Sequence, residues 1–124
     1  MSKAIGIAAA LVAALLGGNA RADGDPARGE ARFQECAACH KLDAASNGLG
    51  PSLNGIFERK AAALADFHYS PALKRSGIVW SPETLEAYLT DPQAFVPGNR
   101  MPYAGMKDPR DRADLIAYLA KASK

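Results

Sequence analysis

The chain has 124 residues, which is the size of one domain. Hydrophobic residues make up 48% and charged residues 23%, an ordinary composition that excludes a disordered chain. The 2 cysteines are too few for a disulfide-stapled scaffold, and the net charge of +2 is far below that of a nucleic-acid-binding domain. Aromatic residues are only 7%, so we expect a non-protein group to fill part of the core.

Residues 1–22 are predicted to be a secretory signal peptide. Lys3 gives a positive start, residues 4–18 carry no charge, and Ala20, Arg21 and Ala22 form an A-x-A cleavage pattern. The uncharged stretch is short for a membrane anchor, which needs about 20 apolar residues. We therefore expect cleavage after Ala22, a periplasmic location and a single mature domain of residues 23–124.

Cleavage would also remove the excess of positive charge. Lys3 and Arg21 are basic and the segment holds no acid, so residues 23–124 carry 13 basic and 13 acidic side chains. The formal net charge of the mature chain is then zero. Attraction to charged partners would depend on where the charges lie.

Five prolines follow Asp or Ser, and each pair is predicted to begin a helix. An Asp or Ser side chain can accept hydrogen bonds from the free N–H groups of the first turn, and proline suits the first helical position. The pairs are Asp25-Pro26, Ser70-Pro71, Ser81-Pro82, Asp91-Pro92 and Asp108-Pro109.

The residues after each pair indicate how long the helices are. Residues 26–38 suit three turns with Phe33 and Ala37 on one face, whereas the helices after Pro71 and Pro92 are cut short by Gly77 and Pro97. The two remaining helices show apolar side chains at the i, i+3, i+4 spacing of a buried stripe. These stripes are Leu85, Tyr88 and Leu89, then Leu115, Tyr118 and Leu119.

The fold class that follows is all-α. No stretch of the mature chain alternates between apolar and polar residues with the period of a strand. We expect three main helices, one or two short ones and long loops. The loop from His40 to about Ser70 is long enough that we expect it to serve a site.

The pentapeptide Cys36-Ala37-Ala38-Cys39-His40 is the strongest motif in the sequence. Cys-x-x-Cys-His is typical of covalent attachment of a c-type haem. Two thiols at this spacing can each reach one vinyl group of the same haem, and His40 can then bring its imidazole to the iron.

Three alternatives explain the motif less well. A thioredoxin-like disulfide expects a βαβ context, which is absent. A zinc site would need His68 or an acid as its fourth ligand. A structural disulfide leaves His40 unexplained.

The sixth iron ligand has three candidates. Met101 lies in a loop preset by Pro97, Gly98 and Pro102, and a His/Met pair is typical of electron transfer. Met106 precedes the last helix and could equally fill the core. His68 lies between two aromatic residues, where a structural role is common. The residues alone favour Met101 but leave all three open.

The mature chain resembles a class I c-type cytochrome, and is similar to mitochondrial cytochrome c and to short soluble bacterial cytochromes c. Several separated stretches carry the resemblance in order: GDPARGEARF, CAACH, GLGPSLNGIFERK, FHYS, GIVW, AYLTDP, FVPGNRMPYAGMK and RADLIAYLAK. The resemblance implies one covalent haem c, held by Cys36 and Cys39, with His40 and Met101 as axial ligands. Met106 then belongs to the packing.

The resemblance also implies supporting roles around the haem. The carbonyl of Pro51 would accept the second ring N–H of His40 and make the imidazole a better donor. The other expected roles are a propionate environment (Arg59, Tyr69, Trp80), a hydroxyl near the methionine sulfur (Tyr88), an anchor for the ligand loop (Asn99), and packing of Gly29 and Phe33 against Leu115 and Tyr118.

Two departures from mitochondrial members stand out. The mature chain lacks their strongly basic ring, although Lys41, Lys74, Arg100 and Lys107 could form a smaller basic rim or simply belong to a mixed surface. Leu73 lies where those members carry an asparagine near the haem, so the buried water there should differ.

The function expected from the resemblance is that of a soluble periplasmic electron carrier without enzymatic activity of its own. Its partners would be a quinol–cytochrome c reductase and a terminal oxidase, reaction centre or periplasmic reductase. We expect a monomer that binds no nucleic acid and does not insert in a membrane. The competing functions are a haem enzyme or gas-binding module with an open sixth position, and a subunit dedicated to one dehydrogenase.

Overall fold

The computed structural model describes residues 24–44 and 46–124, so the predicted signal peptide lies outside the described residues. Every Asp-Pro and Ser-Pro pair begins a helix, as predicted. In each case the Asp or Ser side chain accepts a backbone N–H of the first turn and the proline lies in that turn. The helices are α1 (Pro26–Ala37), α2 (Pro71–Arg75), α3 (Pro82–Thr90), α4 (Pro92–Phe95) and α5 (Pro109–Ala122).

The described residues form an all-α fold, which confirms the predicted all-α class. Their only β-type pairing is an isolated bridge between Lys60 and Val79. None of the helices in this part of the chain combines the length and the apolar character needed to cross a lipid bilayer.

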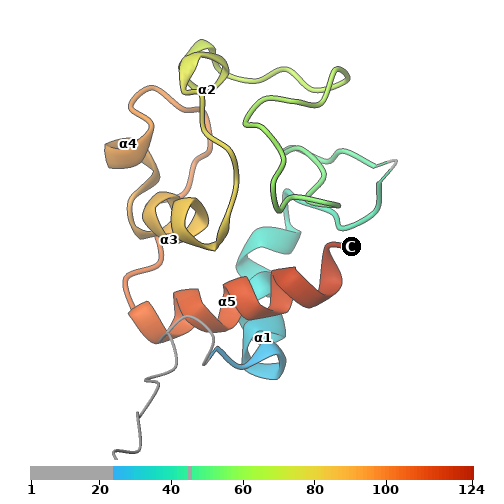
Figure 1. Ribbon diagram of the computed structural model, residues 1–124, viewed down its shortest axis with the longest axis vertical. Helices are drawn as coiled ribbons and strands as arrows, with labels where there is room; N and C mark the ends of the chain where they lie inside the picture. The colour runs from blue at the N-terminus through green and yellow to red at the C-terminus, as the bar shows by residue number, and fades with distance from the viewer. Residues whose placement is uncertain (1–23, 45) are drawn as a thin grey trace, which may run out of the picture.

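The two longest helices, α1 and α5, cross in direct contact at the base of the molecule (Figure 1). Gly29 makes this crossing possible, because a Cβ atom there would overlap the carbonyl oxygen of Asp114. One turn further on, the rings of Phe33 and Tyr118 pack with centroids 5.5 Å apart. The predicted contact is therefore confirmed, although the buried face of α1 is Gly29 and Phe33 while Ala37 is exposed.

The crossing is also held by charge. Asp114 is 2% exposed, and its carboxylate accepts the backbone N–H of Asp25 at 2.7 Å and the Nε–H of Arg28 at 2.9 Å. Because both carboxylate oxygens have donors, this buried charge is satisfied.

Above the crossing, α3 and α4 lie to the left and the loop of residues 41–70 to the right in Figure 1. The buried stripe of α3 consists of Leu85, Tyr88 and Leu89, as the spacing predicts. It continues the core formed by Leu115, Ile116 and Leu119 of α5.

The long loop is braced by side chains rather than by regular structure. Ser52 is 2% exposed, its N–H donates to Asn47 Oδ1 at 2.9 Å, and its hydroxyl donates to the carbonyl of Asp43. The guanidinium of Arg59 donates to the carbonyls of Ser52 and Asn54 at 2.7 and 3.0 Å. These hydrogen bonds therefore hold the loop in one conformation.

Candidate haem-binding site

An apolar cavity of about 520 Å³ lies between the loop, α3 and the α1–α5 crossing. Its lining comes from α1, α3, α5, residues 49–73 and the segment 99–103. Residues far apart in the sequence thus meet around one space, which is lined mainly by apolar side chains with a few polar groups. The low aromatic content predicted a space of this kind.

The pentapeptide motif opens into this cavity. Cys36 lies in the last turn of α1, and Cys39 and His40 follow directly after its end. All three line the cavity, and the two cysteines form no disulfide. The N–H groups of Cys39 and His40 both donate to the carbonyl of Cys36, so a tight turn brings the three side chains to one wall.

The three alternatives for the motif gain no support from the described residues. The described residues contain no sheet beside the motif and no group of three or more His, Cys, Asp or Glu side chains placed to hold a metal ion. Burial also raises the pKa of the Cys36 thiol to about 11, with a further contribution from the carboxylate of Glu35. The thiol is therefore protonated at neutral pH and differs from the low-pKa cysteine of a redox motif.

His40 is oriented by the segment Gly50-Pro51. Its Nδ1 lies 2.7 Å from the carbonyl oxygen of Pro51, and a carbonyl can only accept, so Nδ1 carries the proton and Nε2 keeps its lone pair free. Gly50 permits this approach, because a Cβ there would come within 2.5 Å of Cε1 of the ring. Burial lowers the pKa of His40, although the bond to Pro51 opposes this shift. The lowered pKa favours the neutral imidazole.

Met101 also lines the cavity, on a loop held by Asn99. The Asn99 amide donates to the carbonyls of Pro92 and Val96 at 2.9 and 3.1 Å, and its oxygen accepts the N–H of Met101 at 2.9 Å. Asn99 is 8% exposed, so these bonds are shielded from water. The structure therefore gives Asn99 the anchoring contacts that the resemblance implied.

The hydroxyl of Tyr88 reaches the same methionine. It donates toward Met101 Sδ at 3.8 Å, and the ring packs on Trp80 with centroids 5.1 Å apart. Burial raises the pKa of Tyr88 to about 12, so the phenol remains a donor across the neutral range.

The other two candidate ligands are placed differently. Met106 is 5% exposed, packs in the core and is not among the residues that line the cavity. His68 borders the cavity but is exposed. Of the three candidates, Met101 therefore lines the same cavity as His40 and is held there by Asn99 and Tyr88.

Arg59, Tyr69 and Trp80 all line the cavity. The Tyr69 hydroxyl accepts the N–H of Leu64 at 3.3 Å. Arg59 donates only to carbonyl groups, and none of the described carboxylates pairs with it. Burial lowers the pKa of Arg59. A half-buried guanidinium without an anionic partner suits a ligand that carries carboxylates.

Three residues at this site were missed by the sequence reasoning. Leu49 is 84% exposed although it borders the cavity, and Glu35 and Tyr103, which also line it, are joined by a hydrogen bond of 2.9 Å from Tyr103 Oη to Glu35 Oε2. Neither the exposure of one leucine nor the pairing of two distant residues leaves a signal in a single sequence. Leu73 lines the cavity, as expected.

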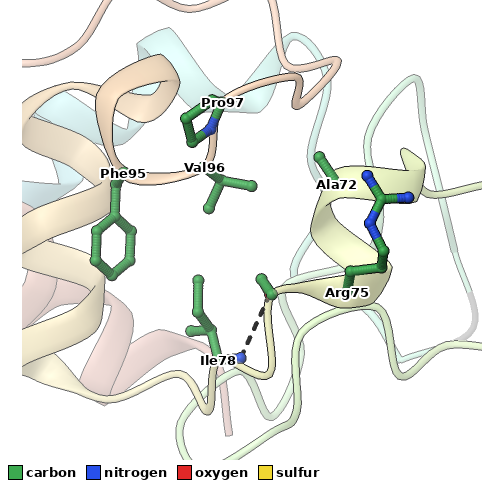
Figure 2. A pocket seen from close by; sticks show the side chains of 7 residues that line it. Ala72, Arg75, Ile78, Phe95, Val96 and Pro97 are labelled. Carbon is green, nitrogen blue, oxygen red and sulfur yellow. Dashed lines mark hydrogen bonds between the residues drawn. The ribbon is translucent and has the colours of Figure 1, made fainter.

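A second depression, of about 470 Å³, lies on the surface between α2 and α4. Figure 2 shows Ile78, Val96 and Pro97 around it, with Arg75 as its charged side chain. It shares no lining residue with the cavity and contains none of the Cys, His or Met residues of the motifs. The site of interest is therefore the cavity.

The cavity fits a haem attached through two thioethers. One apolar space is lined by both thiols, a neutral imidazole with a free Nε2, a thioether, and a guanidinium that pairs with none of the described carboxylates. An all-α fold with this site defines a c-type haem protein. The Cytochrome c family model matches residues 26–123, and the chain belongs to this family. Its cofactor is a single covalent haem c.

Known relatives agree with this assignment. The cytochrome c2 of Rhodomicrobium vannielii is 44% identical over 119 residues, covering 95% of both chains. The cytochrome c of Theileria annulata is 48% identical over 103 residues, covering 82% of this chain and 89% of its own. Among solved structures, cytochrome cH from Methylobacterium extorquens has a TM-score of 0.75 and 43% identity, covering 79% of this chain and 99% of its own. Proteins of this family are electron carriers.

Proposed function

We propose that the chain is a soluble periplasmic electron carrier in which His40 and Met101 are the axial ligands of the haem iron. The observation that supports this most directly is the position of Met101, which lines the cavity with its sulfur next to the Tyr88 hydroxyl. Met106, by contrast, is buried outside the cavity.

The bound haem would supply one-electron chemistry at its iron, and the protein residues hold that centre fixed. The carbonyl of Pro51 keeps the ring of His40 in one orientation, and Asn99 keeps the backbone of Met101 in place. Little of the surrounding structure then has to move when the charge of the centre changes. Arg59, Tyr69 and Trp80 would surround a haem propionate, with Arg59 offsetting its charge.

The border of the cavity suits brief contact with another redox protein. Leu49 offers an exposed apolar side chain at the border, and Arg100, which also lines the cavity, is exposed. Lys41, Lys74 and Lys107 are exposed as well and would extend a basic rim. Partners would be a quinol–cytochrome c reductase as donor and a terminal oxidase, reaction centre or periplasmic reductase as acceptor.

The decisive experiment is an absorption spectrum of the holoprotein and of three variants. We expect covalent haem with the weak far-red band of an iron–thioether bond in the oxidised parent, and no binding of carbon monoxide to the reduced parent. The band should disappear in Met101→Ala and persist in Met106→Ala and His68→Ala, which are matched controls.

A parent protein without this band that readily binds carbon monoxide would overturn the proposal. The sixth position would then be open, and the protein should be assayed as a peroxidase or a gas-binding protein. A parent protein that shows neither the band nor carbon monoxide binding, and that gains carbon monoxide binding in His68→Ala, would reassign the ligand to His68.

Export is tested separately. The periplasmic fraction of cells that express the whole chain should contain the haem protein with Asp23 at its N-terminus. A chain that retains residues 1–22 and remains with the membranes would contradict cleavage after Ala22.

A further inference from the structure

A hydrogen bond connects two chain segments that line the cavity. The hydroxyl of Tyr103 donates to Oε2 of Glu35 at 2.9 Å, and both residues line the cavity. Glu35 lies in the last turn of α1, directly before Cys36, whereas Tyr103 belongs to the loop that carries Met101. The bond therefore ties the methionine loop to the segment through which haem is attached.

Tyr103 is coupled closely to Met101. The backbone N–H of Tyr103 donates to the carbonyl of Met101 at 2.9 Å, which forms a tight turn over three residues. Asn99 holds the N–H of Met101 at 2.9 Å from the other side. The backbone of Met101 is thus held at two points: internally by buried Asn99, and at the cavity border through the ring of Tyr103.

Glu35 has no competing partner in the part of the chain that the structure describes. Among the described residues its carboxylate is hydrogen-bonded only to Tyr103, and no ion pair is formed with the neighbouring Arg32, which lies against Asp111 at 3.7 Å. A phenol that donates to a carboxylate makes a charge-assisted bond, which is stronger than a neutral one. The contact is therefore specific to this pair of side chains.

We propose that Tyr103 and Glu35 are positioning residues that latch the methionine loop and so limit how often Met101 leaves the iron. This inference rests on the proposed function, since it takes Met101 as the ligand. Opening of the latch would let the loop swing away from α1, and a small neutral nitrogen base could then bind in place of the thioether. The latch acts on the rate of ligand exchange, whereas Asn99 fixes the resting position of the loop.

The test is the rate at which imidazole binds the oxidised holoprotein, measured by stopped-flow absorption. Tyr103→Phe keeps the ring and removes the hydroxyl, so we expect binding about three- to tenfold faster, the effect of losing one net hydrogen bond. Glu35→Ala should give the same increase. Glu35→Gln, which keeps an acceptor oxygen, should give a smaller one. The variant that combines Tyr103→Phe with Glu35→Ala should be no faster than either alone, because the two changes remove the same bond.

Tyr118→Phe is the matched control, since it removes the hydroxyl of a phenol that packs on Phe33 and does not line the cavity, and it should leave the rate unchanged. Hydrogen exchange gives a second readout, in which the amide of Tyr103 should lose protection in Tyr103→Phe. Unchanged imidazole rates in Tyr103→Phe, with the far-red band intact, would overturn the latch and leave the proposed function standing. A parent protein without the far-red band would overturn both. Additive effects in the double variant would show that the two residues act separately, which also contradicts the latch.

Discussion

The N–H of Asp25 donates to Oδ1 of Asp114 at 2.7 Å, although 89 residues separate the two in the sequence. Asp25 is also the N-cap of α1, and Asp114 lies in the middle of α5. The residue that begins the first helix is thus fixed to the last helix. Because the Cys-x-x-Cys-His motif lies at the other end of α1, this contact helps to set the position of the motif in the cavity.

The same carboxylate should make stability depend on acid pH. Hydrogen bonds from Arg28 and from the N–H of Asp25 lower the pKa of Asp114 below its usual value of about 4, although burial opposes them. The stabilisation is present above the unfolded-state pKa and is lost as pH falls through the lower folded-state pKa. Asp114→Asn should cost about 1–3 kcal/mol at pH 7, and the difference from the parent should shrink below pH 4.

Urea unfolding midpoints of the holoprotein at pH 7 and pH 3 check this expectation. Asp111→Asn is a suitable control, because the ion pair of Asp111 with Arg32 is long and partly exposed, at 3.7 Å. A penalty in Asp114→Asn that stays constant down to pH 3 would contradict the assigned origin of the stabilisation.

Gly29→Ala should destabilise the protein. At an exposed helical position the change would gain about 1 kcal/mol from helix propensity. Here the new Cβ would overlap the backbone carbonyl of Asp114, which cannot move without shifting α5. Overpacking of this kind typically costs about 1–3 kcal/mol, so we expect a net loss in a denaturant titration. Ala31→Gly, at an exposed position of the same helix, should lose only the propensity difference. A more stable Gly29→Ala variant would refute the close crossing.

Arg112 should be needed to hold the segment between the methionine loop and α5. Its guanidinium is bonded to Glu86 at 2.7 Å and donates to the carbonyls of Met106 and Lys107 at 2.7 and 3.1 Å. Arg112→Met leaves these groups without donors, and we expect a loss of roughly 3–5 kcal/mol in unfolding free energy. Glu86→Gln, which keeps an acceptor for Arg112, should lose clearly less in the same titration. Equal losses would show that the carbonyl contacts contribute little.

Tyr88→Phe should lower the reduction potential if Met101 is the ligand. The Tyr88 hydroxyl draws electron density from the sulfur, so its removal makes the thioether a better donor and favours the oxidised iron. A hydrogen bond worth about 0.5–1.5 kcal/mol corresponds to roughly 20–60 mV for one electron. Potentiometric titration measures the shift. Tyr118→Phe serves as the control, and a potential equal to that of the parent would argue against the Tyr88–Met101 contact.

Asn99→Ala should lower the thermal stability of the loop that carries Met101 more than that of the helical fold. The substitution removes two donors to buried carbonyls and the acceptor for the N–H of Met101. On heating, the far-red band should then disappear at a lower temperature than the helical circular dichroism signal. Asn99→Asp can accept the N–H of Met101 but cannot donate to the carbonyls of Pro92 and Val96, so it should not restore the thermal stability of the band. Simultaneous loss of both signals in Asn99→Ala would show that Asn99 supports the whole fold.

Local chemistry made much of the fold predictable. A cap followed by proline specifies a helix start within a few residues, which is why all five pairs predicted α1 to α5 correctly. The stripe of Leu85, Tyr88 and Leu89 faced the core for the same reason, because spacing alone decides which side of a helix is apolar. The buried face of α1 was harder to predict, because it depends on Gly29, which contacts α5. Ala37, which was expected on that face, is exposed.

Contacts between distant residues could not be predicted in the same way. A single sequence gives no sign that Asp114 is buried against Arg28, or that Glu35 meets Tyr103, since each of these side chains also suits a solvated surface. The site residues could be proposed from the sequence, because the Cys-x-x-Cys-His motif and a methionine in a proline-rich loop each indicate a specific chemistry by themselves. The structure brings those residues to one cavity, and their roles as ligands remain predictions for the experiments above.

The two sides of the cavity differ in how they are assembled. Cys36, Cys39 and His40 are neighbours in the sequence, so haem can be attached to them while the rest of the chain is still unfolded. Met101 reaches the cavity only when α3, α4 and the loop that contains Asn99 have taken their places. In a maturing chain the methionine would therefore engage last, and its absorption band would mark completion of folding.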